Sequence, residues 1–242
     1  MGVIKSQIAS LAGSSKFGPA AYGETIATTH ASSATPKTLL AAPAAGKVRR
    51  VGIGNTCDGA GRFFVPNSEA QLTEFKLGAY TFYSNDMGTG GYDTIPRIIV
   101  PSGLALTATL SQDVEVDFAF SWAEHDDSDF GCVITELTGT SWVTVLGPAP
   151  SGKIYVPIES AYGSISMIFN GDTVDHGYDI ELYDGVTEYP LYTGGSFSGR
   201  EDLYNAMTPP IHGDLVYRVR LAEAVDTINP VAFMCFAIID EA

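Results

Sequence analysis

The chain carries two sequence marks that recur at nearly the same spacing. Gly46-Lys47 and Gly152-Lys153 lie 106 positions apart, and each follows an apolar segment ending in a Pro- and Ala-rich turn. Further along, Gly103 and Gly213 lie 110 positions apart, and each precedes a segment in which apolar residues alternate. Two marks in the same order at nearly the same offset indicate a duplicated unit of about 100 residues, the ordinary size of a β-sandwich.

Composition supports an all-β fold for both copies. The 242 residues include 26 Gly and 13 Pro, and only 17% are charged, which favours short extended segments joined by tight turns over long charged helices. An apolar strand is predicted at the end of each copy, over residues 114–122 and 231–239. We therefore predict two tandem β-sandwich domains, jelly-roll or immunoglobulin-like, over residues 36–126 and 127–242, preceded by an extended N-terminal arm over residues 1–35.

Local patterns predict several connections. The turn that ends at Gly46-Lys47, like its copy at Gly152-Lys153, has a hairpin signature because strand-like segments flank it. Asn170-Gly171-Asp172 is a second typical hairpin turn. The best candidate for a helix is Glu201–Ala206, and it would be short.

The predicted arm differs in composition and charge from the rest of the chain. It is rich in Ala, Ser, Thr and Gly, has no sustained period, and should not become ordered by itself. The first 50 residues contain six basic side chains and one acid, whereas the whole chain has a net charge of −15. The arm could pack along its own domain or lie on another subunit, and we favour the second interpretation because wide contact must offset its ordering entropy. The predicted partner-binding residues, which would pair with an acidic partner surface, are Lys5, Lys16, Lys37, Arg49 and Arg50.

Charge, hydropathy and cysteine spacing exclude several classes of protein. A net charge of −15 opposes generic nucleic-acid binding by long-range repulsion. The longest apolar run, residues 231–239, is too short to span a membrane, and no continuous apolar segment near the N-terminus indicates a secretory signal. Cys57, Cys132 and Cys235 match no metal-ligand spacing, and we interpret them as buried free thiols in a reducing compartment.

Two acidic clusters are candidates for a metal site. The run Glu124–Asp129 lacks the ligand order of an EF-hand loop, and its position between the copies favours a solvated interdomain linker. Asp172, Asp175 and His176 could hold a cation, but a turn rich in Asp needs no metal. We predict no metal site.

No catalytic or cofactor motif is present. The segment Gly195–Gly199 has Phe197 at its centre and so fails the G-x-S-x-G pattern. The two Gly-Lys pairs lack the upstream glycine and following Ser or Thr of a phosphate-binding loop. The sequence does not exclude a pair of catalytic carboxylates for glycoside cleavage, since such residues come together only in the folded structure. We therefore predict no catalytic residue, no cofactor and no enzymatic activity.

Aromatic residues leave a carbohydrate-binding interpretation open. They make up 11% of the chain, and exposed Tyr or Trp on a sandwich can stack on sugars. Trp122, however, alternates with Phe118 and Phe120, which predicts that all three share one face and that this face belongs to the core.

One segment resembles a known group of proteins. The run Ala41–Val51, followed by Gly52–Thr56, is similar to the opening of β-sandwiches in virion proteins of tailed bacteriophages, such as capsid decoration proteins and some tail or fibre proteins. The resemblance implies a structural virion protein, assembled in the host cytoplasm, that decorates or cements the capsid as a homo-oligomer in contact with the major capsid protein. A tail or baseplate protein, or a receptor-binding module that takes a glycan, is the alternative.

Overall fold

The computed structural model describes residues 21–31, 36–51, 62–64, 72–84, 92–94, 98–110, 114–158, 165–170, 176–197, 200–204, 209–224 and 230–241. These residues form strands joined by turns, and no helix occurs among them. The described part of the chain accordingly contains no helix long and apolar enough to cross a membrane.

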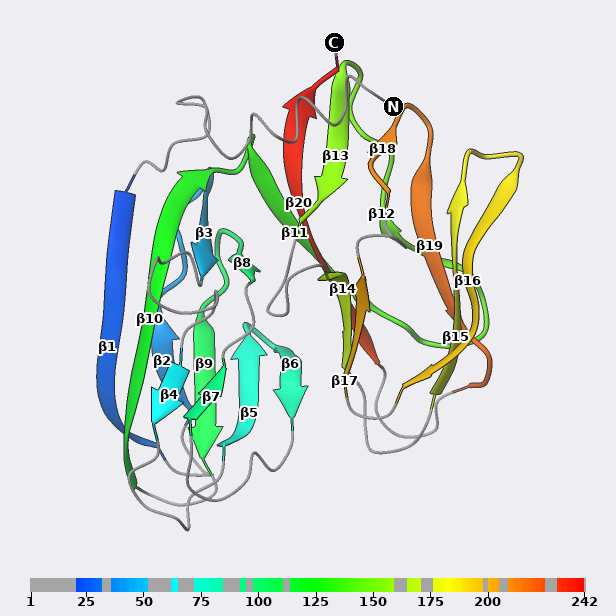
Figure 1. Ribbon diagram of the computed structural model, residues 1–242. Coiled ribbons are helices and arrows are strands. Elements are labelled where there is room, and N and C mark those ends of the chain that lie inside the picture. Colours follow the sequence, from blue (N-terminus) through cyan, green and yellow to red (C-terminus); the bar gives the residue numbers. More distant parts are fainter. Residues whose placement is uncertain are drawn as a thin grey trace.

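The strands fall into two sets along the chain (Figure 1). Those of the first unit are β1 (Ala21–Ala31), β2 (Lys37–Leu40), β3 (Lys47–Val51), β4 (Arg62–Phe64), β5 (Leu72–Leu77), β6 (Tyr80–Ser84), β7 (Tyr92–Thr94), β8 (Ile99–Val100), β9 (Leu106–Leu110) and β10 (Val114–Asp126). Those of the second unit are β11 (Phe130–Glu136), β12 (Val143–Leu146), β13 (Lys153–Pro157), β14 (Ile165–Asn170), β15 (His176–Tyr183), β16 (Glu188–Phe197), β17 (Arg200–Tyr204), β18 (Ile211–His212), β19 (Val216–Leu221) and β20 (Val231–Asp240).

Each unit has two antiparallel sheets, and the strand order of the two units is the same. In the first unit the sheets run β7-β4-β10-β3-β8, with β1 also on β10, and β2-β9-β5-β6. In the second they run β17-β14-β20-β13-β18, with β11 also on β20, and β12-β19-β15-β16. Adding ten to each strand number of the first unit gives the second. The predicted all-β fold of two sandwiches is therefore confirmed, and the sequence repeat corresponds to a repeat of topology.

The duplicated turn is not the hairpin that its sequence predicts. Strands β2 and β3 belong to different sheets, and so do β12 and β13, so the turn carries the chain from one layer of the sandwich to the other. Proline lacks the N–H that a ladder needs, and Pro43, Pro148 and Pro150 lie in these connections. The hairpin predicted at Asn170-Gly171-Asp172 is also wrong, because β14 and β15 lie in different sheets.

The helix predicted at Glu201–Ala206 is likewise corrected. Its first residues belong to strand β17, which pairs with β14 from Ile165↔Tyr204 to Asn170↔Arg200. An isolated helical pattern of two turns is marginal in water, so pairing with a neighbouring strand decides the local structure.

Strand β20 lies between two apolar clusters, and residues on both of its faces are buried. Ala232, Met234 and Phe236 pack with the inner residues of the second sandwich. The alternate residues, among them Phe233 and Cys235, belong to the same cluster as the core of the first unit. On this side β6 contacts β14 and β20, and β8 contacts β11 (Figure 1). We call this apolar contact between the units the seam.

The acidic run Glu124–Asp129 connects the two units through the end of a strand and a tight turn, with residues 126–128 exposed and His125 buried. Strand β10 continues through Asp126, a turn occupies residues 127–129, and β11 begins at Phe130. Within the run His125 is buried, at 3% exposure, with its ring 4.6 Å from that of Phe130. The pairing of β10 with β3 extends through Asp126 and thereby orders a segment whose charge alone suggested a solvated one.

Part of the predicted arm is a strand of its own domain. β1 pairs with β10 along its whole length, from Ala21↔Glu124 to Ala31↔Val114. This strand occupies the edge of β10 that β11 occupies on β20. For residues 21–31 the structure thus has the arrangement that we had not favoured, while residues 1–20 and 32–35 lie outside the described residues.

Candidate functional site

The five predicted partner-binding residues do not form one surface in the described chain. Lys5 and Lys16 lie outside the described residues, and Lys37 is the first residue of β2, partly exposed. Arg49 is engaged within the chain: its Nε donates to Glu124 Oε2 at 3.1 Å and its Nη1 to the Ala41 carbonyl at 2.9 Å. The Arg49 charge is therefore largely compensated inside the first unit.

The other arginine of β3 has a different environment. The Arg50 guanidinium carbon lies 4.5 Å from the centre of the Phe130 ring. This cation–π contact connects β3 of the first unit with β11 of the second. Arg50 thus helps to join the two units. A role for Arg49 or Arg50 toward another protein stays a prediction.

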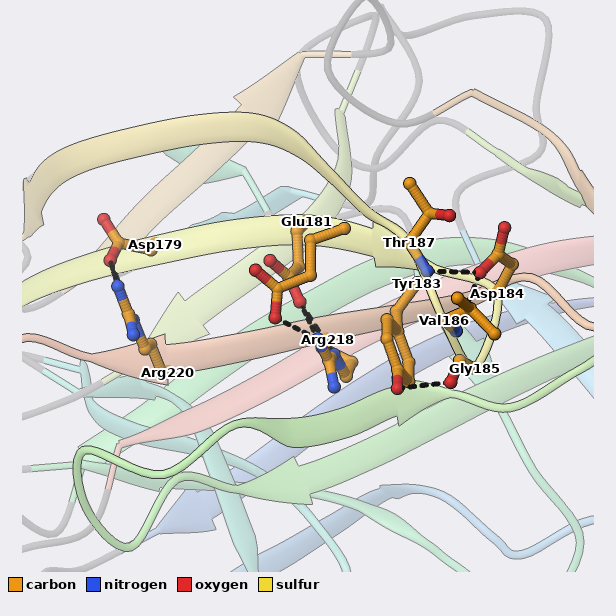
Figure 2. Close-up of polar contacts among 10 residues, drawn as sticks. Asp179, Glu181, Tyr183, Asp184, Gly185, Val186, Thr187, Arg218 and Arg220 are labelled. Atoms are coloured by element: carbon orange, nitrogen blue, oxygen red, sulfur yellow. Dashed lines mark hydrogen bonds and ion pairs between the residues drawn. The ribbon is translucent and has the colours of Figure 1, made fainter.

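A denser group of polar side chains lies on the sheet β12-β19-β15-β16. Register places Glu181 of β15 directly opposite Arg218 of β19, and Asp179 opposite Arg220, so two opposite-charge pairs stand side by side (Figure 2). We call this group the Arg218 cluster; its members are Asp179, Glu181, Tyr183, Arg218, Arg220 and Trp142.

The first of these pairs is the more buried one. Glu181 is 3% exposed, and its Oε1 accepts from Arg218 Nε at 2.8 Å and from Arg218 Nη2. The Arg218 guanidinium also lies 3.6 Å from the centre of the Tyr183 ring and 5.3 Å from that of Trp142. Arg218 Nη2 also lies 3.4 Å from Oε1 of the exposed Glu188. Removing Arg218 would leave the buried Glu181 carboxylate without this cation, and removing Glu181 would leave Arg218 with the longer contact to Glu188, so both changes are unfavourable.

The second pair is more exposed and is oriented by the backbone. Arg220 Nε donates to Asp179 Oδ2 at 2.9 Å, and the Gly194 N–H donates to Asp179 Oδ1 at 2.9 Å. The Gly194 hydrogen bond, followed by Arg220, holds the pKa of Asp179 below its usual value. The Arg220 guanidinium lies 4.6 Å from the Trp142 ring centre, so both arginines flank this indole.

Beside the cluster, the β15–β16 turn forms a rigid tip. Asp184 Oδ1 accepts from the backbone N–H of Thr187 at 2.6 Å and of Val186 at 2.9 Å, and these bonds lower the pKa of Asp184. Tyr183 Oη donates to the Gly185 carbonyl at 2.6 Å, as Figure 2 shows. The tip holds Val186 at 89% exposure, and Tyr189 on the following strand is 45% exposed. An ordered tip with exposed apolar groups suits contact with another macromolecule, because little entropy is lost when it docks.

The charged side chains of this surface are compensated within the chain. The cluster lies on a sheet, and its charges are paired with one another. Within the described ranges no group of three His, Cys, Asp or Glu residues could hold a metal ion. His212 is exposed and lies 3.8 Å from Glu241, and Asp172, Asp175 and Cys57 fall outside the described residues.

Sequence reasoning missed the Arg218 cluster, although half of its signal was visible. The alternation in residues 178–183 places Asp179, Glu181 and Tyr183 on one face of strand β15. Arg218 and Arg220 alternate in the same way within β19. Only the register of β15 on β19 brings the two alternations together, and a single sequence does not reveal that register.

Comparisons with known proteins give no close relative. No family model matches the sequence, and no curated protein matches it. A conserved protein of unknown function, PA5104 from Pseudomonas aeruginosa PAO1, is 11% identical, with 88% of this chain and 79% of that chain covered and a TM-score of 0.28. A triple jelly-roll protein of an archaeal virus turret is 9% identical, covering 92% of this chain and 57% of that one, with a TM-score of 0.27.

A third solved structure is the SPP1 Dit protein, described as a hub of the adsorption apparatus in phages that infect Gram-positive bacteria. It is 10% identical, with 80% of this chain and 99% of that chain covered and a TM-score of 0.24. Two of the three neighbours are therefore virus or phage proteins. Likenesses at these TM-scores are too weak to carry an argument about what this chain does.

Proposed function

We propose that the chain is a structural protein of a virus particle, and more specifically that it decorates or cements the capsid of a tailed bacteriophage as a homo-oligomer. The observation that carries the proposal is the seam. Strand β20 is buried on both faces, with one face in the core of the second sandwich and the other in the cluster of the first, so the two sandwiches are closely packed and can transmit load as one block. No catalytic residue is assigned.

The described surface supports this proposal in two ways. The charged side chains of the Arg218 cluster form ion pairs with one another, and these pairs rigidify the sheet β12-β19-β15-β16. The tip at residues 184–187 offers an ordered, partly apolar contact point. Repetition of modest contacts around a symmetric lattice gives strong retention without a deep binding cleft.

The N-terminal segment remains the proposed anchor, with its attachment restricted to residues 1–20. Lys5 and Lys16 lie in that part, and residues 21–31 are needed on the edge of β10. A truncation that removes β1 would expose a long strand edge and test folding rather than attachment.

Incorporation into particles tests the proposal. The full chain and a variant that lacks residues 1–20 would each be produced during assembly, and particles purified on a density gradient would be analysed by quantitative mass spectrometry. We expect the full chain at a fixed copy number per major capsid protein, and the variant to be depleted at least tenfold. Full chain absent from particles would refute the structural role, whereas equal incorporation of both would refute only the anchor.

A tail or receptor-binding role is the second candidate, favoured by the aromatic rings of the Arg218 cluster beside the exposed Tyr189. Aromatic faces with neighbouring charged groups can bind sugars. Binding on a broad glycan array that is lost in Trp142→Ala and kept in Val186→Ala would support it. Absence of binding on the array would exclude this role for the surface.

A further inference from the structure

Two of the three cysteines face each other across neighbouring strands. In the pairing of β11 with β20, Cys132 lies directly opposite Cys235. Directly opposite residues of an antiparallel pair project to the same face of the sheet. Both side chains contact the apolar cluster of the seam, so both sulfurs lie on the side of the first unit.

The hydrogen-bond pattern shows which kind of pair they form. The Ile238 N–H donates to the Asp129 carbonyl at 2.8 Å, which makes these two residues a hydrogen-bonded pair just beyond Phe130↔Ala237. Hydrogen-bonded and non-hydrogen-bonded pairs alternate along such a ladder, so Cys132 and Cys235 form a non-hydrogen-bonded pair. In agreement, the Cys235 carbonyl accepts from the Ile158 N–H, on the β13 side of β20, at 3.0 Å.

This geometry fits a disulfide. Non-hydrogen-bonded pairs bring Cα atoms to about 4.5 Å and their side chains closer than in the alternate pairs. Disulfides span Cα separations of roughly 4.4–6.8 Å, so the bond needs no change of register. The equivalent positions of β1 and β10 are Glu24 and Ser121, which face each other in the same way, so only the second unit could form it.

The surroundings favour reaction at these sulfurs. The Ile99 N–H of the first unit donates to Cys235 Sγ at 3.3 Å. The hydrogen bonds from the Cys132 thiol and from Ile99 lower the pKa of Cys235, whereas the hydrogen bond to Cys235 and burial raise the pKa of Cys132, so the two thiols interact directly. Cys132 is partly exposed, which gives a small oxidant access to the pair.

We propose that Cys132 and Cys235 form a disulfide when the folded protein meets a peroxide, and that this bond locks β11 to β20 at the seam. One thiolate attacks the peroxide, breaks the O–O bond and becomes a sulfenic acid as hydroxide leaves. The other sulfur displaces the sulfenic hydroxyl, and this hydroxyl and the hydroxide from the first step each take one thiol proton to give water. Two thiols and one hydrogen peroxide thus give one disulfide and two waters, with two electrons passing from sulfur to oxygen.

The bond would stabilise the fold chiefly by restricting the unfolded chain. It closes a loop between positions 132 and 235, and the entropy removed from the unfolded state grows with loop length. We expect the oxidised protein to unfold at a temperature roughly 5–10 °C higher than the reduced protein. The disulfide forms or fails to form whatever role the protein has in a particle.

The experiment uses the full chain with Cys57→Ser, so that only the facing pair remains. Folded protein is treated with hydrogen peroxide, denatured, alkylated and analysed by mass spectrometry. We expect neither cysteine to be alkylated, a mass about 2 Da below that of the reduced chain, and a peptide pair that bridges β11 and β20. Cys132→Val, with folding checked by circular dichroism, should form no intramolecular link and show no rise in unfolding temperature.

Alkylation of both cysteines after treatment, or their conversion to sulfinic acids or links between two chains, would overturn the proposal. If Cys57→Ser does not fold, peptide mapping of the unaltered protein distinguishes a link between positions 132 and 235 from one that involves Cys57. A link that includes Cys57 in place of the facing pair would also overturn it.

Discussion

The two units keep the same topology while their side chains differ, and the positions that agree are those that fix turns and register. Gly46 and Gly152 have φ of +76° and +74° at the same turn. The lysine that follows each glycine forms an ion pair with an aspartate at the end of the last strand, Lys47 with Asp126 at 2.5 Å and Lys153 with Asp240 at 2.6 Å. Backbone conformation and strand alignment, rather than particular core side chains, therefore define the repeated fold.

The units differ most in what surrounds their last strand. The residue before the terminal aspartate is Ile239 in β20 and His125 in β10, and both are buried. On the sheet β12-β19-β15-β16 of the second unit Glu181 faces Arg218, whereas on the corresponding sheet β2-β9-β5-β6 of the first unit Lys76 faces Thr107. The second unit thus places charge pairs between strands, and the first pairs Lys76 with Glu74 of its own strand, at 2.9 Å.

The largest effect is expected where the second unit meets the first. Ala237→Glu places a carboxylate on the fully buried seam face of β20, in the cluster of apolar side chains that both units form. We expect the free energy of unfolding in urea to fall by at least about 4 kcal/mol. The control Val186→Glu, at a site that is 89% exposed, should change it by less than about 0.5 kcal/mol. Equal effects would show that the seam is not a shared apolar cluster.

Much of this architecture could be predicted from the sequence because it follows from local chemistry. The alternation of apolar residues and the glycine turns predict strands and their boundaries, and the repeated Gly-Lys mark predicts the duplication. Whether consecutive strands join in one sheet depends on long-range pairing, and for that reason the turns after β2 and β12 were misassigned as hairpins. Likewise, the acidic run before Phe130 looked solvated because its sequence does not reveal that β3 pairs with it. The Arg218 cluster depends on register in the same way.

A second comparison tests the sheets β12-β19-β15-β16 and β2-β9-β5-β6. Glu181→Ala would leave the Arg218 guanidinium, itself largely buried, without its main partner, and we expect a loss of about 3 kcal/mol in unfolding free energy. Lys76→Ala removes a partly exposed ion pair and should cost less than about 1 kcal/mol. Urea unfolding at neutral pH measures both. The double variant Glu181→Leu with Arg218→Met should recover much of the loss, and failure to do so would assign the effect to lost packing rather than to an uncompensated charge.

The buried histidine gives the first unit a pH dependence that the second lacks at the same position. Burial, followed by repulsion from Arg50, lowers the pKa of His125 to about 4, and Asp126 opposes this only in part. As pH falls, His125 is therefore protonated near pH 6.5 in the unfolded chain but only near pH 4 in the folded chain. The contribution of neutral His125 to stability is complete above pH 6.5 and is lost as pH falls toward 4.

Replacing His125 with the residue of the other unit isolates this effect. Between pH 7 and 4.5 we expect the unaltered protein to lose about 2 kcal/mol more unfolding free energy than His125→Ile, since one pKa unit corresponds to about 1.4 kcal/mol. Both proteins carry the same carboxylates, which cancel in the difference. A difference that does not change with pH would mean that His125 stays neutral in both states or is charged in both.

The smallest effect concerns the positions that the units share. Gly46→Ala and Gly152→Ala place a Cβ in open space, so only the positive φ opposes the substitution. A left-handed backbone costs an L-residue about 1 kcal/mol, and the two variants should lose this amount equally in urea unfolding. Gly139→Ala is the matched control, because that glycine also has open space but no positive φ, and it should lose nothing measurable. Because one face of β20 is packed in the apolar cluster of the first unit, unfolding of one unit would expose the seam of the other, and both substitutions should therefore lower a single cooperative transition. Unequal losses of unfolding free energy, or two resolved transitions, would contradict this prediction and would show that the two units unfold separately.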